Sequence, residues 1–335
     1  MRAVVLVGGF GTRLRPLTNT RPKQMLPIVN RPMIEHVVGH LADHGIDDVV
    51  LSMGYRPDAF AAAYPSGRCA GATLHYAVEP EPLDTAGAIR FAAEDAGIDS
   101  RFLVLNGDIL TDLDLTAFLA FHESHGAEGT IHLFPVDDPS RFGVVPTDDD
   151  GRVLAFVEKP PRDEAPTNLI NAGTYVLEPS VLDRIPAGRK VSVERETFPA
   201  MAAAGTLYAV GGATYWLDTG TPEQYLQAQV DLLEGVRGTP VDGVDPTAEV
   251  SPDATVVRSV IGPGATVDAG ATVMRSVLLR GAWVHAGSIV VDSVLGESAE
   301  VLPGARIVGG TVVGDGEVIE SGTSLDGARV PVAAP

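Results

Sequence analysis

Apolar residues recur every five or six positions along the C-terminal part of the chain, and this repeat limits the possible folds more than any other feature. One cycle of three apolar positions takes 17 or 18 residues. A helix would repeat at about 3.6 residues and a strand at two. Three apolar positions per cycle, with turns between them, predict coils of three short faces stacked into a prism. The positions are Val250, Val256, Ile261, Val267, Val273, Leu278, Val284, Val290, Leu295, Val301, Ile307, Val313, Ile319 and Leu325.

The residues before this repeat alternate between short apolar runs and helical patterns. The runs at 3–7, 47–53 and 101–108 predict strands, and the patterns at 33–45 and 87–97 predict helices. Alternating strands and helices indicate an α/β domain with a mostly parallel sheet covered on both faces. A segment rich in Gly, Pro and Asp, 235–246, reads as a linker. We therefore predict two domains, 1–235 and 247–330.

The net charge limits the kinds of molecule that the chain can bind. The chain carries 44 acidic residues against 24 Lys and Arg, a formal net charge of −20. Such a surface repels nucleic acids and anionic membranes. The single cysteine excludes an internal disulfide framework, and no apolar run approaches the ~20 residues of a membrane span. We expect a cytoplasmic protein that binds neither nucleic acid nor membrane.

A cluster of cations on this acidic chain follows the first predicted strand. The segment "GGFGTRLRPLTNTRPK" (8–23) combines a glycine turn with four basic residues. It lacks the third glycine of a dinucleotide fingerprint and the Gly-Lys-Ser/Thr end of a P-loop. The amides of such a turn can approach a polyphosphate closely while cations neutralise it. Solvated surface cations are the alternative, but they leave the clustering unexplained. The residues are Gly8, Gly9, Gly11, Arg13, Arg15, Arg21 and Lys23.

Two acids follow apolar runs and suggest a metal. Asp108 ends "FLVLNGD" and Asp218 lies in "YWLDTGTP". A carboxylate beside a buried strand is costly unless it is paired or bound to a metal. Two carboxylates near a triphosphate would suit Mg²⁺, which favours oxygen ligands and phosphates. A turn or helix-capping role is the alternative for each acid.

The segment "GGFGTRLRPLTNTRPKQMLP" resembles the signature of the sugar-phosphate nucleotidyltransferases, and further motifs of that family follow in order. They are "EPEPLDTAGA" (79–88), "LNGD" (105–108), "FGVV" (142–145), "FVEKP" (156–160), "NAGTYV" (171–176), "SVERETFP" (192–199) and "WLDTGTPEQYL" (216–226). The resemblance implies a Rossmann-like nucleotidyltransferase domain, and the coils resemble the left-handed parallel β-helix of hexapeptide repeats that many members append. Within the family, the motifs look most like the members that join GTP to mannose 1-phosphate.

The resemblance also implies roles for individual residues. Catalysis would fall to Arg13, Lys23, Asp108 and Asp218, and the two acids would hold Mg²⁺. The nucleotide would bind to Leu6, Gly8, Gly9, Gly11, Thr12, Arg13, Lys23, Glu79, Pro82, Thr85, Gly87 and Asp108. The sugar phosphate would bind to Gly143, Glu158, Lys159, Asn171, Gly173 and Arg195. Pairing between Glu158 and Lys159, or between Arg195 and Glu194 or Glu196, is the alternative for these charged groups.

The choice of base depends on Glu79. A carboxylate only accepts hydrogen bonds, which suits the adjacent N1–H and amine of guanine better than thymine. Gln24 favours thymine instead, because the segment that contains it resembles the family members that use dTTP and glucose 1-phosphate. Asp84 stands where the family usually has glycine, and a positive φ there would be strained.

Two functions of other classes stay open. One is a non-catalytic regulatory subunit that binds a nucleotide sugar, although binding alone would not need the two metal-binding acids. The other is an acyltransferase, since similar coils carry that activity elsewhere, but His285 is the only histidine in the coils. The exposed coil edges predict lateral packing of chains, and therefore a homo-oligomer.

Overall fold

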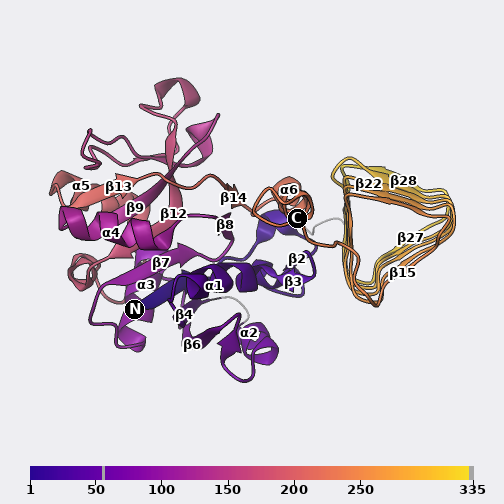
Figure 1. The fold of residues 1–335 in the computed structure, drawn as a ribbon, viewed down its shortest axis with the longest axis horizontal. Helices are drawn as coiled ribbons and strands as arrows, with labels where there is room; N and C mark the ends of the chain where they lie inside the picture. The colour runs from indigo at the N-terminus through magenta and orange to yellow at the C-terminus, as the bar shows by residue number, and fades with distance from the viewer. Residues whose placement is uncertain (55–56, 332–335) are drawn as a thin grey trace. The chain divides into compact units, whose positions relative to one another are not determined.

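A computed structural model describes residues 1–54 and 57–331 of the chain (Figure 1). The chain divides into two compact units. The first comprises Met1–Gly9 and Glu35–Trp216, and the second comprises Phe10–Ile34 and Leu217–Pro335.

The first unit is built on a mixed sheet with a parallel centre. Strands β1 (Arg2–Leu6), β4 (Asp48–Met53), β6 (Ala72–Val78) and β7 (Phe102–Asn106) run parallel, in the order β7-β1-β4-β6. Antiparallel strands extend it: β5 (Arg68–Cys69) pairs with β6, and β12 (Leu169–Leu177) pairs with β7. Beyond β12 lie β9 (Gly129–Pro135), β10 (Gly143–Val144), β11 (Val157–Glu158) and β13 (Leu207–Val210). Short strands β8 (Ile109–Thr111) and β14 (Trp216–Asp218) complete the set.

Helices pack against this sheet and close its core. Helix α3 (Asp84–Asp95) contacts β1, β4 and β6, whereas α4 (Leu115–His125) and α5 (Phe198–Ala203) contact β9 and β13. Local signals set the ends of α4: the Asp114 side chain accepts from the Ala117 amide, and Gly126 ends the helix at φ 57°. The other helices are α1 (Met33–Asp43) and α2 (Pro57–Ala63). Helical turns occur at η3 (Pro139–Arg141), η4 (Arg162–Glu164), η5 (Pro179–Arg184) and η6 (Val193–Thr197).

The C-terminal coils of the second unit form three five-stranded parallel sheets, the arrangement of a left-handed parallel β-helix. The first is β15 (Glu249–Val250), β18 (Thr266–Val267), β21 (Trp283–Val284), β24 (Glu300–Val301) and β27 (Val318–Ile319). The second is β16 (Thr255–Val257), β19 (Thr272–Met274), β22 (Ile289–Val291), β25 (Arg306–Val308) and β28 (Ser324–Asp326). The third is β17 (Val260–Ile261), β20 (Val277–Leu278), β23 (Val294–Leu295), β26 (Val312–Val313) and β29 (Arg329–Val330).

The predicted repeat forms the interior of this prism. Val267 pairs with Val284, which pairs with Val301, and Val301 pairs with Ile319, so successive apolar positions stack. Eleven of the fourteen repeat positions, Ile261 to Ile319, are core residues. Val250 in the first coil is 36% exposed, because no coil covers it on one side. The sequence prediction of the fold is confirmed in both parts of the chain.

The second unit also contains the segment 10–34 and helix α6 (Pro222–Glu234). The segment consists of two 3₁₀ turns, η1 (Thr12–Leu14) and η2 (Lys23–Met25), and a small hairpin of β2 (Pro27–Ile28) and β3 (Arg31–Pro32). Helix α6 holds the hairpin: Gln229 accepts from the Val29 amide at 2.7 Å and donates to the Pro27 carbonyl at 3.0 Å.

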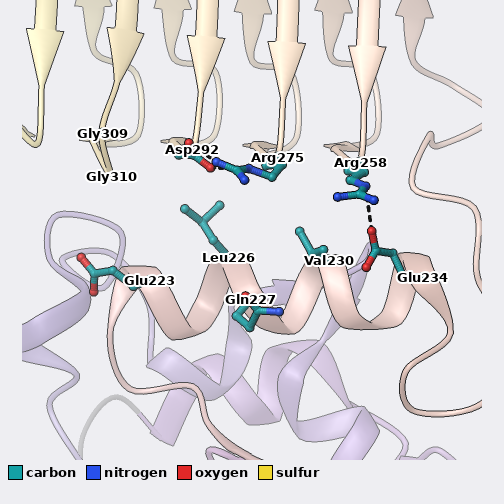
Figure 2. A pocket seen from close by; sticks show the side chains of 10 residues that line it. All are labelled: Glu223, Leu226, Gln227, Val230, Glu234, Arg258, Arg275, Asp292, Gly309 and Gly310. Carbon is teal, nitrogen blue, oxygen red and sulfur yellow. Dashed lines mark hydrogen bonds and ion pairs between the residues drawn. The ribbon is translucent and has the colours of Figure 1, made fainter.

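Helix α6 also borders a groove of about 520 Å³ along one corner of the coils (Figure 2). Leu226 and Val230 point from the helix toward the coils, and Glu234 pairs with Arg258 at 2.7 Å. Arg275 and Asp292 form a second pair at 2.5 Å. None of the helices in the described residues combines the length and apolar character of a membrane span.

A ladder of buried hydroxyls ties the coils together at another position. Ser276 accepts from the amide of Ser293 at 3.2 Å and donates to the carbonyl of Met274 at 2.7 Å. Ser259 accepts from the Ser276 amide in the same way at 3.1 Å. Since these groups are buried, each hydroxyl satisfies an amide that water cannot reach.

We predict that Ser276→Ala lowers the free energy of unfolding by about 1–3 kcal/mol, because the Ser293 amide loses its partner while it stays buried. Urea unfolding of the full chain measures the change. Ser251→Ala is the control, since the Ser251 hydroxyl accepts from the exposed Asp253 amide at 3.3 Å. Equal effects of the two substitutions would contradict the ladder.

Candidate functional site

The carboxyl ends of the four parallel strands meet at one edge of the first unit. Leu6 pairs with Ser52 on one side and with Asn106 on the other. The Gly107 amide donates to the Leu6 carbonyl at 3.0 Å. Gly8, Glu79 and Asp108 follow β1, β6 and β7, so the structure places them at the edge where sheets of this type bind ligands. Asp108 is partly exposed there.

Glu79 lies against the start of the glycine turn. A methyl group at Gly8 would come within 3.6 Å of Glu79 Oε1 and 3.4 Å of the Gly54 amide nitrogen. Glu79 Oε2 accepts from the Leu83 amide at 2.9 Å, and Oε1 accepts from Ser52 Oγ at 3.4 Å. Burial raises the pKa of Glu79, and these two hydrogen bonds offset the rise only in part. The carboxylate therefore keeps acceptor capacity beside the turn, with a raised pKa.

The loop after Glu79 adopts the strained backbone that the sequence suggested. Asp84 has φ 61°, in the left-handed region where the family usually has glycine, and its Oδ1 accepts from the Thr85 amide at 2.8 Å. Helix α3 begins at this residue, three positions earlier than expected. The side-chain hydrogen bond reduces the strain that the backbone alone would carry.

Thr85 and Gly87 each have a structural explanation inside this loop. Thr85 Oγ1 donates to Glu194 at 2.7 Å and accepts from the Val193 amide at 2.8 Å. A methyl group at Gly87 would come within 2.8 Å of Leu83 Cβ. Pro82 is exposed, and Leu6 is partly buried. Their roles in binding a nucleotide stay predictions.

A second group of candidate residues lies on the antiparallel strands of the first unit. Gly143 faces Glu158 across β10 and β11, and a methyl group at Gly143 would come within 2.5 Å of Phe156. Lys159 pairs with Glu158 at 3.0 Å and is more than half exposed. The structure therefore brings Gly143, Glu158 and Lys159 together, and the pairing foreseen as an alternative is present.

Asn171 and Gly173 share an irregular stretch of β12. The pairing with β9 shifts register between Asn171 and Tyr175. The Asn171 side chain accepts from the Gly173 amide at 3.0 Å and donates to the Tyr175 hydroxyl at 2.9 Å. Gly173 has φ 73°, and a methyl group there would come within 2.5 Å of Asn106 Nδ2. Gly173 thus allows Asn106, which precedes Asp108 by two residues, to pack against β12.

Arg195 makes neither of the ion pairs considered for it. Glu194 accepts from Thr85 and from Ser192, and Glu196 pairs with Arg189 at 2.9 Å. Arg195 is exposed in the π-helical turn η6, where its amide donates to Ser192 Oγ at 3.2 Å. Its guanidinium has no ion pair within residues 1–54 and 57–331.

Sequence reasoning missed Trp216 as part of the same region. Its indole N–H donates to the carbonyl of Ala172 at 2.9 Å, and its ring lies 5.7 Å from those of Phe134 and Phe142. Trp216 is the first residue of the motif "WLDTGTPEQYL", in which only Asp218 was assigned a role. The indole holds the Asn171–Gly173 stretch through its backbone.

The second unit contains the rest of the glycine turn. Gly11 has φ 61°, and a methyl group there would come within 3.0 Å of Thr18 Cγ2 and 3.1 Å of Lys23 Cβ. Thr18 Oγ1 donates to the Gly11 carbonyl at 2.8 Å. The turn therefore packs directly against the stem of Lys23. Gly9 and Thr12, on either side, are exposed.

Arg13 and Asp218 approach one another in the same unit. Arg13 Nη2 lies 3.9 Å from Asp218 Oδ2, and 61% of the Arg13 side chain is exposed. Asp218 Oδ1 accepts from the Gly220 amide at 2.8 Å. A methyl group at Gly220 would clash with Arg13 Nη2, so glycine is needed for this approach. One cation and one of the two predicted metal ligands therefore share a site.

Arg21 does not behave as a phosphate-binding cation. It pairs with Glu297 and Asp315 of the coils, and 18% of its side chain is exposed. Asp108 belongs to the first unit and Asp218 to the second. Within the described part of the chain, no group of three or more His, Cys, Asp and Glu side chains could hold a metal ion by itself.

Two family models cover nearly the whole chain. A model described as nucleotidyl transferase matches residues 2–235, and one described as the GMPPB C-terminal domain matches residues 240–333.

Curated relatives include mannose-1-phosphate guanylyltransferase of Mycobacterium tuberculosis, which is 44% identical over 77% of this chain and 74% of the relative. Mannose-1-phosphate guanyltransferase of Aspergillus fumigatus is 46% identical over 68% of this chain. The chain spans only 62% of the Aspergillus relative.

Among solved structures, HddC from Yersinia pseudotuberculosis complexed with GMP-PN is 32% identical with a TM-score of 0.59. The match covers 68% of this chain and 97% of HddC. A putative glucose-1-phosphate thymidylyltransferase from Bacillus anthracis is 26% identical with a TM-score of 0.62, over 68% and 94% of the two chains.

We predict that Gly173→Ala lowers the free energy of unfolding by about 2–4 kcal/mol, since it adds a clash with Asn106 to the strain of a positive φ. Gly188→Ala is the matched control, because Gly188 has φ 65° and nothing within 4 Å of an added methyl group. Urea unfolding should give about 1 kcal/mol for the control. Equal losses in both proteins would show that the contact with Asn106 is unimportant.

Proposed function

Because the chain belongs to the nucleotidyl transferase family, we propose that it transfers a guanylyl group from GTP to mannose 1-phosphate, forming GDP-mannose and releasing pyrophosphate. The main support is that the relatives with this activity in their names are 41–46% identical to the chain. The match to the GMPPB C-terminal domain supports the same assignment.

In the proposed reaction, a phosphate oxygen of mannose 1-phosphate attacks the α-phosphorus of GTP. A new P–O bond forms, the bond to the β-phosphate breaks, and pyrophosphate leaves with the electron pair. Both reactants are polyanions, so positioning and charge neutralisation supply most of the catalysis. Arg13 would hold the departing pyrophosphate through its planar fork, and Lys23 would act as a point charge near the α-phosphate.

The remaining nucleotide contacts come from the glycine turn and the loop after β6. We propose that Gly8, Gly9 and Gly11 allow the backbone to approach the nucleotide. Glu79 would accept hydrogen bonds from N1–H and the amine of guanine. Its position beside Gly8 supports this role. The other proposed contacts are Leu6, Thr12, Pro82, Thr85, Gly87 and Asp108.

The sugar phosphate would bind to the antiparallel strands of the first unit. Lys159 would bind the phosphate, and Glu158 would accept hydrogen bonds from sugar hydroxyls. Gly143, Asn171 and Gly173 would complete this pocket. Lys159 stays more than half exposed although it pairs with Glu158, and Arg195 is exposed, so an anionic ligand can reach both cations.

Mg²⁺ fits the donors that the chain offers. Asp108 is partly exposed and Asp218 is 18% exposed, and carboxylate oxygens are the ligands that Mg²⁺ prefers. The ion usually keeps several waters and binds substrate phosphates, so two carboxylates are sufficient from the protein. When bound, it would neutralise the triphosphate and polarise the phosphorus.

Further properties belong to the same proposal. We propose a catalytic domain of residues 1–235 and a β-helix domain of residues 247–330, a homo-oligomeric assembly through the coils, and a cytoplasmic location.

Pyrophosphate release in the presence of Mg²⁺ tests the reaction directly. Four nucleoside triphosphates are crossed with mannose 1-phosphate and glucose 1-phosphate, and Asp108→Asn serves as the blank. We expect turnover confined to GTP with mannose 1-phosphate, and a loss of at least about 100-fold in Asp108→Asn. A preference for dTTP with glucose 1-phosphate would replace the proposed substrates with those of the alternative.

Glu79→Gln tests whether Glu79 recognises guanine as the base of the nucleotide. We expect KM for GTP to rise about tenfold or more, because the amide places a donor against the donors of guanine. In the wild type, KM for GTP should rise as the pH falls through the raised pKa of Glu79, since only the ionised group accepts both hydrogen bonds. This rise of KM at low pH should be absent in Glu79→Gln. If the rise persists in that variant, another group causes it.

A further inference from the structure

Arg21 anchors the segment that carries Lys23 to the β-helix. Its Nη1 lies 2.5 Å from Glu297 Oε1, and its Nη2 lies 2.8 Å from Asp315 Oδ2. Glu297 follows β23 and Asp315 follows β26, each two residues after the strand, so they occupy the same corner of successive coils. All three residues belong to the second unit. The guanidinium therefore bridges two layers of the prism.

The coil corner is organised to hold this guanidinium. Asp315 Oδ1 accepts from the Glu297 amide at 2.9 Å, and Asp315 Oδ2 also accepts from Thr20 Oγ1 at 2.7 Å. A methyl group at Gly314 would come within 3.1 Å of Pro16 Cβ, so segment 10–34 packs closely on the coil. Asp315 thus has three donors, two from the segment and one from the neighbouring coil.

Glu297 and Asp315 stabilise the buried charge of Arg21. Burial alone would lower the pKa of Arg21, but the hydrogen bonds and charges of Glu297 and Asp315 outweigh it and raise the pKa. Loss of either acid would remove part of the compensation for a largely buried cation, and loss of both would leave it uncompensated, which is strongly unfavourable. Arg21 is consequently fixed to the coil instead of being available to phosphates.

The anchor is two residues from Lys23. Pro22 between them is buried at φ −61°, and its carbonyl accepts from the Met25 amide at 3.0 Å. Lys23 begins η2, where its own carbonyl accepts from the Leu26 amide at 3.0 Å. On its other side, Lys23 Cβ packs against Gly11. The backbone between the anchor and the glycine turn therefore has little freedom.

We propose that Arg21, Glu297 and Asp315 are positioning residues, through which the β-helix holds Lys23 and the glycine turn in the arrangement that binds the nucleotide triphosphate. This inference rests on the proposed function for the identity of the ligand. It gives the C-terminal coils a part in nucleotide affinity in addition to any part in assembly.

The test compares Arg21→Met with Arg275→Met in the full chain. Arg275 is a matched control, because it pairs with Asp292 at 2.5 Å in the same coils and makes no ion pair with segment 10–34. Kinetic constants for GTP and mannose 1-phosphate are measured with the melting temperature. Hydrogen exchange of residues 11–26 is followed without substrates. Asp315→Asn repeats the test with a smaller change, in case Arg21→Met fails to fold.

We expect Arg21→Met to raise KM for GTP about tenfold, with little change in KM for mannose 1-phosphate, and to speed exchange in residues 11–26. Arg21→Lys should recover part of the affinity, since it keeps the charge but not the fork. Arg275→Met should change no kinetic constant more than twofold. The inference would be overturned by a lower melting temperature with no change in KM for GTP and no change in the hydrogen exchange of residues 11–26. Absence of turnover in the wild type would refute the proposed function instead, and the exchange of residues 11–26 would still decide whether the anchor holds.

Discussion

A guanidinium that is mostly buried requires compensating negative charge. Arg21 pairs with two acids, Glu297 and Asp315, that lie 276 and 294 residues later in the sequence. This requirement joins a loop near the N-terminus to the coils at the C-terminus of an acidic chain. Glu297 and Asp315 can both pair with Arg21, because they are 18 residues apart in the sequence and therefore stack at one corner of the coils. The regular coil thereby becomes a fixed support for an irregular loop.

Glycines of the second unit leave room for two of the cations that we propose bind the phosphates of the nucleotide. Gly11 and Gly220 leave room for Lys23 and Arg13, and neither position would accept a methyl group without displacing its neighbour. In the first unit, a methyl group at Gly8 would meet Glu79 Oε1 at 3.6 Å, an ordinary contact. At Gly11 and Gly220, glycine permits a cationic side chain to approach the backbone closely, and we propose that these cations bind the phosphates of the nucleotide.

Sequence patterns predicted the regular parts of the fold because their physical causes are local and periodic. The apolar repeat identified the interior of the coils: eleven of its fourteen positions are core residues, Val256 and Leu325 are partly buried against them, and Val250 is exposed. The sequence predicted the glycine turn after the first strand and Asp108 at the end of a buried strand, and in the structure Gly8 follows β1 and Asp108 follows β7. The cost at Asp84 was also foreseeable, since a family glycine indicates a positive φ.

Contacts between distant residues were not predictable in this way. Arg21 looked like a fourth phosphate-binding cation because nothing near it in the sequence reveals its partners. Trp216 was overlooked because its role is to donate to a backbone carbonyl, which any strand provides. Helix α3 begins before the predicted start, and the amides of Ala86 and Gly87 in its first turn donate to the carbonyl of the distant Val191.

We propose that residues of both units bind one nucleotide. Hydrogen exchange of the full chain, with and without GTP and Mg²⁺, measures this binding. We expect slower exchange in segments 6–14 and 18–26 and also in segment 79–88. Protection confined to one unit, or no protection at saturating GTP, would contradict it.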